Sequence, residues 1–247
     1  MDVGEILLVL AAVAFGFFAK GVTGLGGPPL AIPVLASFMG VEYAVAVVAI
    51  PAALANFWLM IENRSAASGT RWFLAPMLAT GVVGTLLGVW LLLNIDDRIM
   101  SVLLGLLLLL YIVWYLAEPE RKIDDRTARR LAPPAGFAGG VLAGSTGISA
   151  PVFATYVHSL RLARSGFVFA VSVPFFFLGS MQIVSLATLG GYTQARVTAG
   201  IIACVPVLVV TPIAMRVGKR LSAQTFQYVV LVLLAIASVQ LLWSGLT

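Results

Sequence analysis

The sequence predicts an all-α polytopic membrane protein, and three observations lead to this prediction. Of the 247 residues, 61% are hydrophobic and only 10% are charged, whereas about 25% of the residues of a soluble domain are charged. The charges are also segregated, and runs such as 103–116 do not alternate between apolar and polar residues as the strands of a membrane barrel do. The stretches of membrane-spanning length without Asp, Glu, Lys or Arg are 43–61, 72–95, 99–117, 166–192, 197–215 and 222–247.

Two further apolar stretches, 6–41 and 131–160, are too long for one span and are interrupted by glycine clusters. They bring the expected number of membrane segments to about eight. The single cysteine excludes an intramolecular disulfide, and no cluster of Cys and His suggests a metal. Neither a cofactor nor a nucleic-acid partner is expected, because basic residues beside membrane spans are explained first by topology.

The chain contains an internal repeat. Shifting the sequence by 123 residues places GVTGLGGPPLAIPV (21–34) over GSTGISAPVFATYV (144–157), since 144 − 21 = 123. Both stretches keep a core of Thr, Gly and Pro at the same spacing. We therefore predict a first membrane repeat over 1–117, a hydrophilic cytoplasmic linker over 118–130 and a second membrane repeat over 131–247.

The distribution of lysine and arginine favours an inverted arrangement of the two repeats. If each glycine-broken segment is re-entrant, entering and leaving on the same face, twelve basic residues share one face and only Arg98 and Arg196 lie opposite. Positive charge collects on the cytoplasmic face, so both termini are expected on the periplasmic side of a bacterial cytoplasmic (inner) membrane. If the broken segments instead cross the membrane, the basic residues divide almost evenly; this alternative stays open.

The glycine clusters are expected to build a binding site. Irregular backbone at membrane depth persists only where protein or a water-filled cavity satisfies its polar groups. In the first hairpin we expect half-helices over 6–19 and 28–38, the second starting at Pro28 and Pro29. In the second hairpin Ser149 is expected to cap a half-helix before Pro151. Helix N-termini directed at the bilayer centre attract anions, and secondary transporters use such broken helices.

The charges near this site point to a negative substrate. Lys20 lies inside the first apolar stretch, where a lysine costs about 2.5–3.5 kcal/mol on insertion scales. All ten acidic residues fall at span ends or in loops. The alternative is that Lys20 only extends its ammonium group to the interface and binds no ligand. Two amides in apolar spans, Asn56 and Gln182, either donate to the substrate or join helices.

The motif G-x-T-G-x-G-G-P-P-L-A-x-P (21–33), its weaker copy at 144–157, the length and the number of spans resemble the sulfite exporter TauE/SafE family. The resemblance covers the whole chain and implies transport of small sulfur-containing anions such as sulfite, sulfoacetate and other organosulfonates. The second copy departs from the family pattern, because Ser149 and Ala150 stand where glycines are usual. The substrate-binding residues expected from the two motifs and the residues beside them are Lys20, Gly21, Thr23, Gly24, Gly26, Gly27, Pro28, Gly144, Ser145, Thr146, Gly147, Ser149, Pro151, Asn56 and Gln182.

The expected function is therefore export of a small sulfur-containing anion by alternating access, with the anion bound at the midplane between the two broken helices. An anion channel, or a transporter of another small organic anion, is the alternative. An intramembrane enzyme would need a nucleophile–base pair or metal ligands within the spans, and none is found in the sequence, so no enzymatic activity is expected. Spacings of the type G-x-x-x-G at 84–88 and 136–144 allow close helix contact within one chain or in a homodimer.

Overall fold

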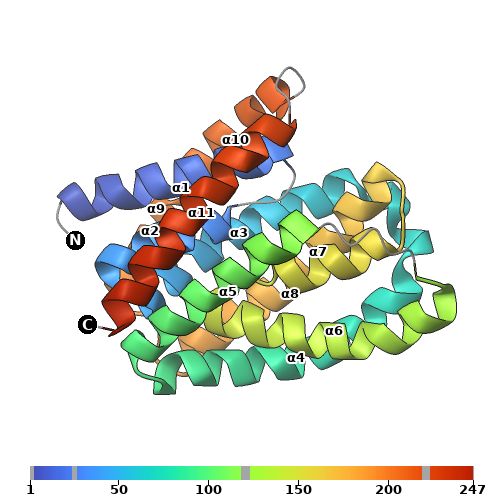
Figure 1. Ribbon diagram of the computed structural model, residues 1–247, viewed down its shortest axis with the longest axis horizontal. Coiled ribbons are helices and arrows are strands. Elements are labelled where there is room, and N and C mark those ends of the chain that lie inside the picture. Colours follow the sequence, from blue (N-terminus) through green and yellow to red (C-terminus); the bar gives the residue numbers. More distant parts are fainter. Residues whose placement is uncertain (1–2, 24–26, 118–122, 219–222, 247) are drawn as a thin grey trace. The chain divides into compact units, whose positions relative to one another are not determined.

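The computed structural model describes residues 3–23, 27–117, 123–218 and 223–246, and every regular element in these ranges is helical (Figure 1). The elements are α1 (Val3–Thr23), α2 (Pro28–Met39), α3 (Val41–Glu62), the short 3₁₀ helix η1 (Arg64–Gly69), α4 (Arg71–Asn94), α5 (Asp97–Ala117), α6 (Asp125–Thr146), α7 (Ala150–Ser159), α8 (Arg164–Thr188), α9 (Gln194–Ile202), α10 (Cys204–Gly218) and α11 (Ala223–Leu246).

The all-α class is confirmed over these residues, which include helices of membrane-spanning length. The five segments that are long and apolar enough to cross a membrane are Val3–Val22, Val41–Glu62, Arg71–Asn94, Arg164–Thr188 and Gln194–Ala214. The first of them differs from expectation. A half-helix over 6–19 was expected there, but α1 has 21 residues, which corresponds to about 31 Å.

The expected span 197–215 is not one unbroken helix. The chain forms α9 and α10 instead, separated at Ala203. Pro206 weakens the helix here, because a proline has no N–H group to bond the carbonyl of Ile202 and its ring clashes with that carbonyl. Prolines inside α3, α4 and α8 do not end those helices, so Pro206 alone does not account for the break. The helical backbone of Ala203 and its bond to the carbonyl of Ala199 keep the two helices close in direction.

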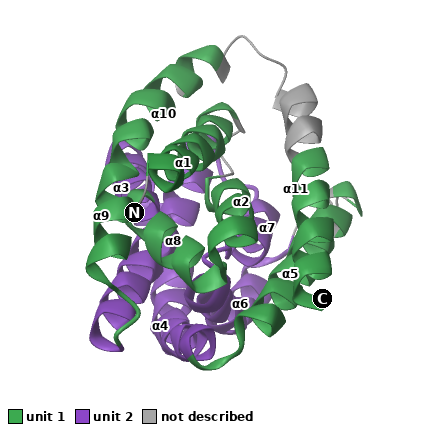
Figure 2. Ribbon diagram, turned by 90° about the vertical axis from the view of Figure 1, so that its left-hand side faces the viewer, with its two compact units in different colours: residues 1–51, 94–118, 190–247 green, residues 52–93, 119–189 purple. Residues whose placement is uncertain are grey.

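The chain forms two compact units, coloured separately in Figure 2. Unit 1 comprises 1–51, 94–118 and 190–247, and unit 2 comprises 52–93 and 119–189. Unit 1 therefore holds α1, α2, the start of α3, α5 and α9 to α11. Unit 2 holds the rest of α3, η1, α4 and α6 to α8. Each unit takes segments from both of the sequence repeats, and each contains one of the two glycine-broken segments.

The order of helices follows the sequence repeat. Shifted by 123 residues, α1 would cover 126–146 and α3 would cover 164–185; α6 in fact begins at Asp125 and ends at Thr146, and α8 begins at Arg164. Elements α2 and α7, α4 and α9–α10, and α5 and α11 correspond in the same way. The inverted orientation of the repeats remains a prediction.

In unit 1, α2 returns along α1 (Figure 1). The N–H group of Gly27 donates to the carbonyl of Gly16 at 2.9 Å, and a Cβ atom on Gly16 would lie only 2.7 Å from the carbonyl oxygen of Gly27. The 12 residues of α2 span about 18 Å, nearly the length of α1 from Gly16 back to Val3. The two open ends of this hairpin therefore lie at about the same level.

Several loops of unit 1 meet at that same end. The backbone N–H of Val41 donates to the Asp97 carboxylate at 2.8 Å, and the Arg196 guanidinium forms an ion pair with Glu42. Glu5, near the start of α1, lies within electrostatic range of Tyr43. These contacts gather the starts of α1, α3, α5 and α9 at one end of the unit.

In unit 2, α7 likewise returns along α6. Phe153 packs against Gly139, where an added Cβ atom would lie 2.3 Å from the ring. The hydroxyl of Tyr156 donates to the carbonyl of Ala128 at 2.9 Å. Just before α6, the N–H of Ile123 donates to the carbonyl of Ser159 at 3.3 Å. The chain thus enters and leaves this second hairpin at neighbouring points.

The helix α6 begins inside the segment that was predicted to be a linker. Asp124 is its N-cap, and its carboxylate accepts bonds from the N–H groups of Arg126 and Thr127. This cap explains why the hydrophilic residues 125–130 are helical, because it satisfies N–H groups that have no partner inside the helix.

A seam of glycines joins α4 to α6 in unit 2. A Cβ atom on Gly140 would lie 2.2 Å from the carbonyl oxygen of Gly81, and one on Gly84 would lie 2.2 Å from that of Phe137. Beside these contacts, the Thr80 hydroxyl donates to the carbonyl of Pro133 at 2.7 Å. The predicted close contact of the G-x-x-x-G segments is therefore made within one chain, backbone against backbone.

Candidate functional site

The first chain break lies later than the sequence suggested. Lys20, Gly21 and Thr23 belong to the last turns of α1. Gly24 and Gly26 lie outside the described residues, as does the side chain of Thr23. A glycine inside a helix costs about 1 kcal/mol, which the packing of α1 against α2 and α10 can offset.

The side chain of Lys20 is buried at this break. It is 5% exposed, and its Nζ atom lies 6.0 Å from the centre of the Phe17 ring. A Cβ atom on Gly27 would lie 3.4 Å from Lys20 Cδ and 3.2 Å from the Phe17 ring. The ammonium group therefore does not extend into solvent, and the alternative of a lysine that only reaches the interface is not favoured.

The start of α2 matches the prediction in position but offers few donors. Pro28 and Pro29 occupy its first positions, as expected. Neither proline has an N–H group, the N–H of Gly27 is bonded to Gly16, and those of Leu30 and Ala31 are bonded to the carbonyl of Gly27. Within 27–31 no backbone N–H group is left for a ligand, so the positive character described here comes from the helix dipole and Lys20.

The second break is a tight turn between α6 and α7. Gly147 ends α6 in the left-handed conformation, with φ 68°, and its N–H bonds the carbonyl of Ala143 at 3.1 Å. Ser149 occupies the N-cap position and Pro151 the first turn of α7, as predicted. The hydroxyl of Ser149 makes no capping bond, however; its carbonyl oxygen accepts from Val152 and Phe153 instead.

Four of the expected binding residues use their polar groups inside the protein. The hydroxyl groups of Ser145 and Thr146 donate to carbonyls of their own helix. The Gln182 amide donates to the carbonyl of Ala143 at 2.6 Å and joins α8 to the end of α6. In α3, the Asn56 amide donates to its own helix. In this structure these hydroxyl and amide groups donate within the protein, and their role in substrate binding stays a prediction.

Three donors at the start of α7 are left over. Among the residues that the structure describes, the N–H groups of Ser149 and Ala150 and the hydroxyl of Ser149 have no hydrogen-bond partner. Both residues are buried, at 5% and 6% exposure. Because unpaired buried donors are costly, this group is the best candidate for ligand contact in unit 2.

Ala150 was not among the expected binding residues, since its side chain carries no chemistry. A signal was nevertheless present in the sequence. A residue between an N-cap and a proline in the first turn is the first residue of the helix, and its N–H has no partner inside the helix. Counting positions from Pro151 would have identified this donor.

The described residues contain no group of three or more His, Cys, Asp or Glu side chains that could hold a metal ion. The only ionisable side chain that the structure describes at either break is Lys20. The arrangement offers positive charge and hydrogen-bond donors, which suits the binding of an anion.

A comparison with known families matches residues 8–241 of this chain to the model of the family described as "Sulfite exporter TauE/SafE". Comparisons with curated proteins and with solved structures found no match. The family match extends over nearly the whole chain, including both chain breaks. The chain therefore belongs to the sulfite exporter TauE/SafE family, a family of membrane transporters for sulfur-containing anions.

Proposed function

We propose that this protein is a secondary transporter that exports a small sulfur-containing oxyanion, such as sulfite, sulfoacetate or another organosulfonate. The observation that carries the proposal is the set of donors without a hydrogen-bond partner on two largely buried residues at the start of α7, Ser149 and Ala150. Membership of the family supports the class of substrate. The proposal includes a bound anion at the midplane and alternating access.

The chemistry of these donors suits a sulfonate or sulfite group. Its oxygens accept several hydrogen bonds at once, and bonds to an anion are stronger than those between neutral groups. The dipole of α7 adds positive character at its N-terminus. In the other unit, the buried ammonium of Lys20 beside the start of α2 supplies a full charge. We propose that the two chain breaks act on the same substrate.

The proposed topology has two inverted repeats with re-entrant hairpins and periplasmic termini. It is supported by the return of α2 along α1 and of α7 along α6, each within its own unit. Among its described residues, the gathered end of unit 1 has only two arginines and no lysine, which suits the periplasmic side. Its charged residues are Glu5, Glu42, Asp96, Asp97, Arg98 and Arg196.

A binding experiment tests the proposal. Purified protein in detergent is titrated with sulfite, thiosulfate, sulfate, sulfoacetate, taurine and acetate while its thermal unfolding is followed. We expect protection by sulfite or by an organosulfonate that carries a net negative charge, and none by taurine, because its ammonium group leaves this sulfonate without a net charge. If no sulfur oxyanion protects the protein, the proposal is wrong.

A matched pair of serine variants tests the site itself. Ser149→Ala removes one donor to the anion, which costs about 1.5–3 kcal/mol, or roughly a 10- to 150-fold weaker Kd. Ser185→Ala serves as the control, because this buried hydroxyl is bonded to the carbonyl of Met181 in its own helix. Equal affinities for the two variants would remove Ser149 from the site.

The mode of transport is tested in proteoliposomes. A transporter shows uptake of labelled anion that is stimulated by unlabelled anion on the opposite side. A channel shows single-channel currents in planar bilayers and no such stimulation. Currents without counterflow would replace alternating access by the channel alternative and leave the anion site in place.

A further inference from the structure

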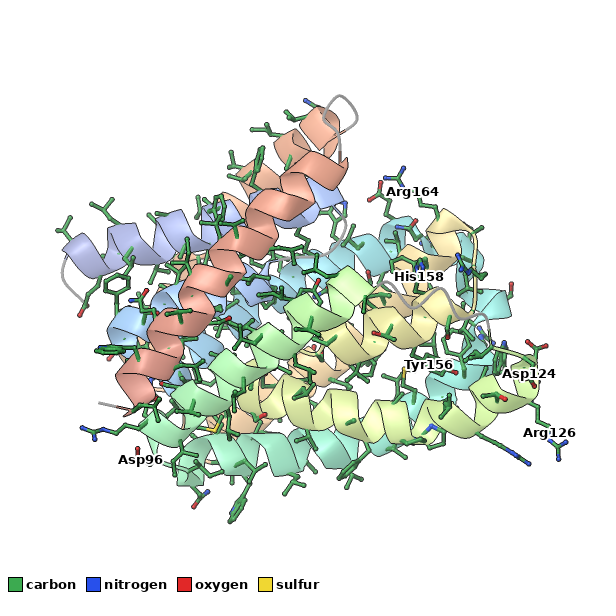
Figure 3. All side chains as sticks on the ribbon, in the orientation of Figure 1. Asp96, Asp124, Arg126, Tyr156, His158 and Arg164 are labelled. Atoms are coloured by element: carbon green, nitrogen blue, oxygen red, sulfur yellow. The ribbon has the colours of Figure 1, made fainter. Side chains whose placement is uncertain are left out.

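One end of unit 2 carries seven exposed arginines. They come from η1, the start of α4, the first two turns of α6 and the connection between α7 and α8, and Figure 3 labels two of them at this end of the unit. We call them the arginine surface: Arg64, Arg71, Arg126, Arg129, Arg130, Arg161 and Arg164.

The arginine surface is held in place by contacts between its elements. The guanidinium of Arg129 lies 5.0 Å from the centre of the Trp72 ring, which joins α6 to α4. The ring of Phe73 lies 5.7 Å from that of Tyr156, which joins α4 to α7. The bond between Ile123 and Ser159 closes the base of the hairpin. The arginines are therefore displayed from a packed end of the unit rather than from separate loops.

The surface lies at the ends of membrane-spanning helices. Two of the segments of spanning length, α4 and α8, begin at Arg71 and Arg164. Apolar side chains stand beside the arginines: Trp72 is partly exposed, and Leu131 is 44% exposed directly after Arg130. Arginine next to tryptophan and leucine at a span end is typical of the level of the lipid headgroups.

The described residues of this end carry a strongly positive net charge. Among them, three acidic residues accompany the seven arginines, so the balance is 7 − 3 = +4; they are Glu62, Asp124 and Asp125. The carboxylate of Asp124 is occupied by the hydroxyl of Thr127 and by the N–H groups that it caps. The carboxylate therefore contributes negative charge to this end, while its hydrogen bonds are made to these capping groups and not to a guanidinium group of the described residues.

We propose that the arginine surface binds the phosphate groups of anionic phospholipids in the adjacent leaflet. A topological signal needs only positive charge and treats lysine and arginine alike, yet eight of the nine Lys and Arg residues in the sequence of unit 2 are arginines, the exception being Lys122. Guanidinium groups bind phosphate through two parallel hydrogen bonds, which an ammonium group cannot form. The choice of arginine thus fits headgroup binding, which lies beyond anion transport and does not depend on it.

The test measures protection by defined lipids. Protein in detergent is mixed with micelles that contain phosphatidylglycerol or phosphatidylcholine, or with inorganic phosphate at the same phosphate concentration, and its Tm is measured. The key variant is Arg126→Gln with Arg130→Gln, which leaves the contact between Arg129 and Trp72 intact. Arg98→Gln, which changes an exposed arginine of unit 1, is the control.

We expect phosphatidylglycerol to raise Tm more than phosphatidylcholine does, and the double glutamine variant to lose at least half of that difference. The control should keep it. Replacing the same two arginines by lysine should also lose part of the difference, although the charge is unchanged. Full protection in either double variant, or equal protection by inorganic phosphate, would overturn the proposal.

Discussion

Replacing Gly140 by alanine would place a methyl carbon inside the contact between α4 and α6. The added Cβ atom would lie 2.2 Å from the carbonyl oxygen of Gly81 and 2.9 Å from its Cα atom. Ordinary contact begins at 3.4 Å, so the helices would have to separate by about 1.2 Å, the difference of 3.4 and 2.2. Because both neighbours are backbone atoms, no change of rotamer can relieve the clash.

The cost follows from overpacking. Such a substitution costs about 1–3 kcal/mol, partly offset by alanine's better helix propensity of about 1 kcal/mol. Separation of the helices would also weaken the contacts of Gly136 and Gly144 on either side and lengthen the bond from Thr80 to Pro133. These losses add to the clash, so we expect Gly140→Ala to destabilise the protein by about 2 kcal/mol.

Gly179→Ala provides a control of opposite sign. Gly179 lies within α8, and a Cβ atom there would meet no heavy atom within 4 Å. Only the gain in helix propensity remains, about 1 kcal/mol. For a chain of this size 1 kcal/mol corresponds to about 2–4 °C in Tm. Thermal unfolding of both variants in the same detergent, followed by tryptophan fluorescence, should therefore move Tm in opposite directions; shifts of the same sign would refute the seam as a determinant of stability.

Two further predictions concern the ends of helices. Gly27→Ala should lower Tm and weaken anion protection, because Gly27 has φ 79° and an added Cβ atom would lie 3.2 Å from the Phe17 ring. An L-residue in such a sparsely populated conformation costs about 1–3 kcal/mol, and an unchanged Tm would contradict the backbone assigned to this turn. The Thr127 hydroxyl, with backbone N–H groups, holds the pKa of Asp124 below its ordinary value of 3.8. Stability from this cap is therefore present above pH 3.8 and lost as the pH falls through the lowered pKa, so the Tm difference between wild type and Asp124→Ala should disappear in acid; a difference that persists there would exclude the charged cap as its source.

The parts of the fold that could be predicted from the sequence depend on local rules. Proline at the start of a helix has a simple steric reason, so Pro28 marked the beginning of α2 correctly. The segregation of charges likewise located α3, α4 and α8. The break at Ala203 was not readable in this way, because the prolines inside α3, α4 and α8 leave those helices unbroken.

The parts that could not be predicted depend on tertiary contacts. Lys20 and Gly21 are poor residues for an apolar helix, yet α1 continues through them to Thr23 because the helix packs against α2 and α10. The charged residues 125–130 were expected to belong to the hydrophilic linker 118–130, and the cap of Asp124 makes them the start of α6. In both cases helix packing or a single side-chain hydrogen bond, rather than composition, determines where the helix begins or ends. Neither kind of contact can be inferred from one sequence.

The expected site residues differ in the hydrogen bonds that their hydroxyl groups make, for a related reason. Sequence spacing grouped Ser145, Thr146 and Ser149 as hydroxyl donors. Only the three-dimensional structure shows which acceptor each hydroxyl group bonds. A serine or threonine inside a helix can donate to the carbonyl four residues before it, and Ser145 and Thr146 both do so. Ser149 precedes the helix and has no such carbonyl in reach.

The position of Ser149 before the first residue of α7 also determines its effect in the second motif, where Ser149 and Ala150 stand in place of glycines. A serine at an N-cap normally accepts a bond from the second or third N–H of the helix. Here Pro151 removes one of those N–H groups, and the next two bond the carbonyl of Ser149. The hydroxyl is therefore not consumed by the cap, and it adds a side-chain donor to the two backbone donors beside it. Serine in place of glycine at position 149 thus increases the number of hydrogen-bond donors that the start of α7 can offer to an anion.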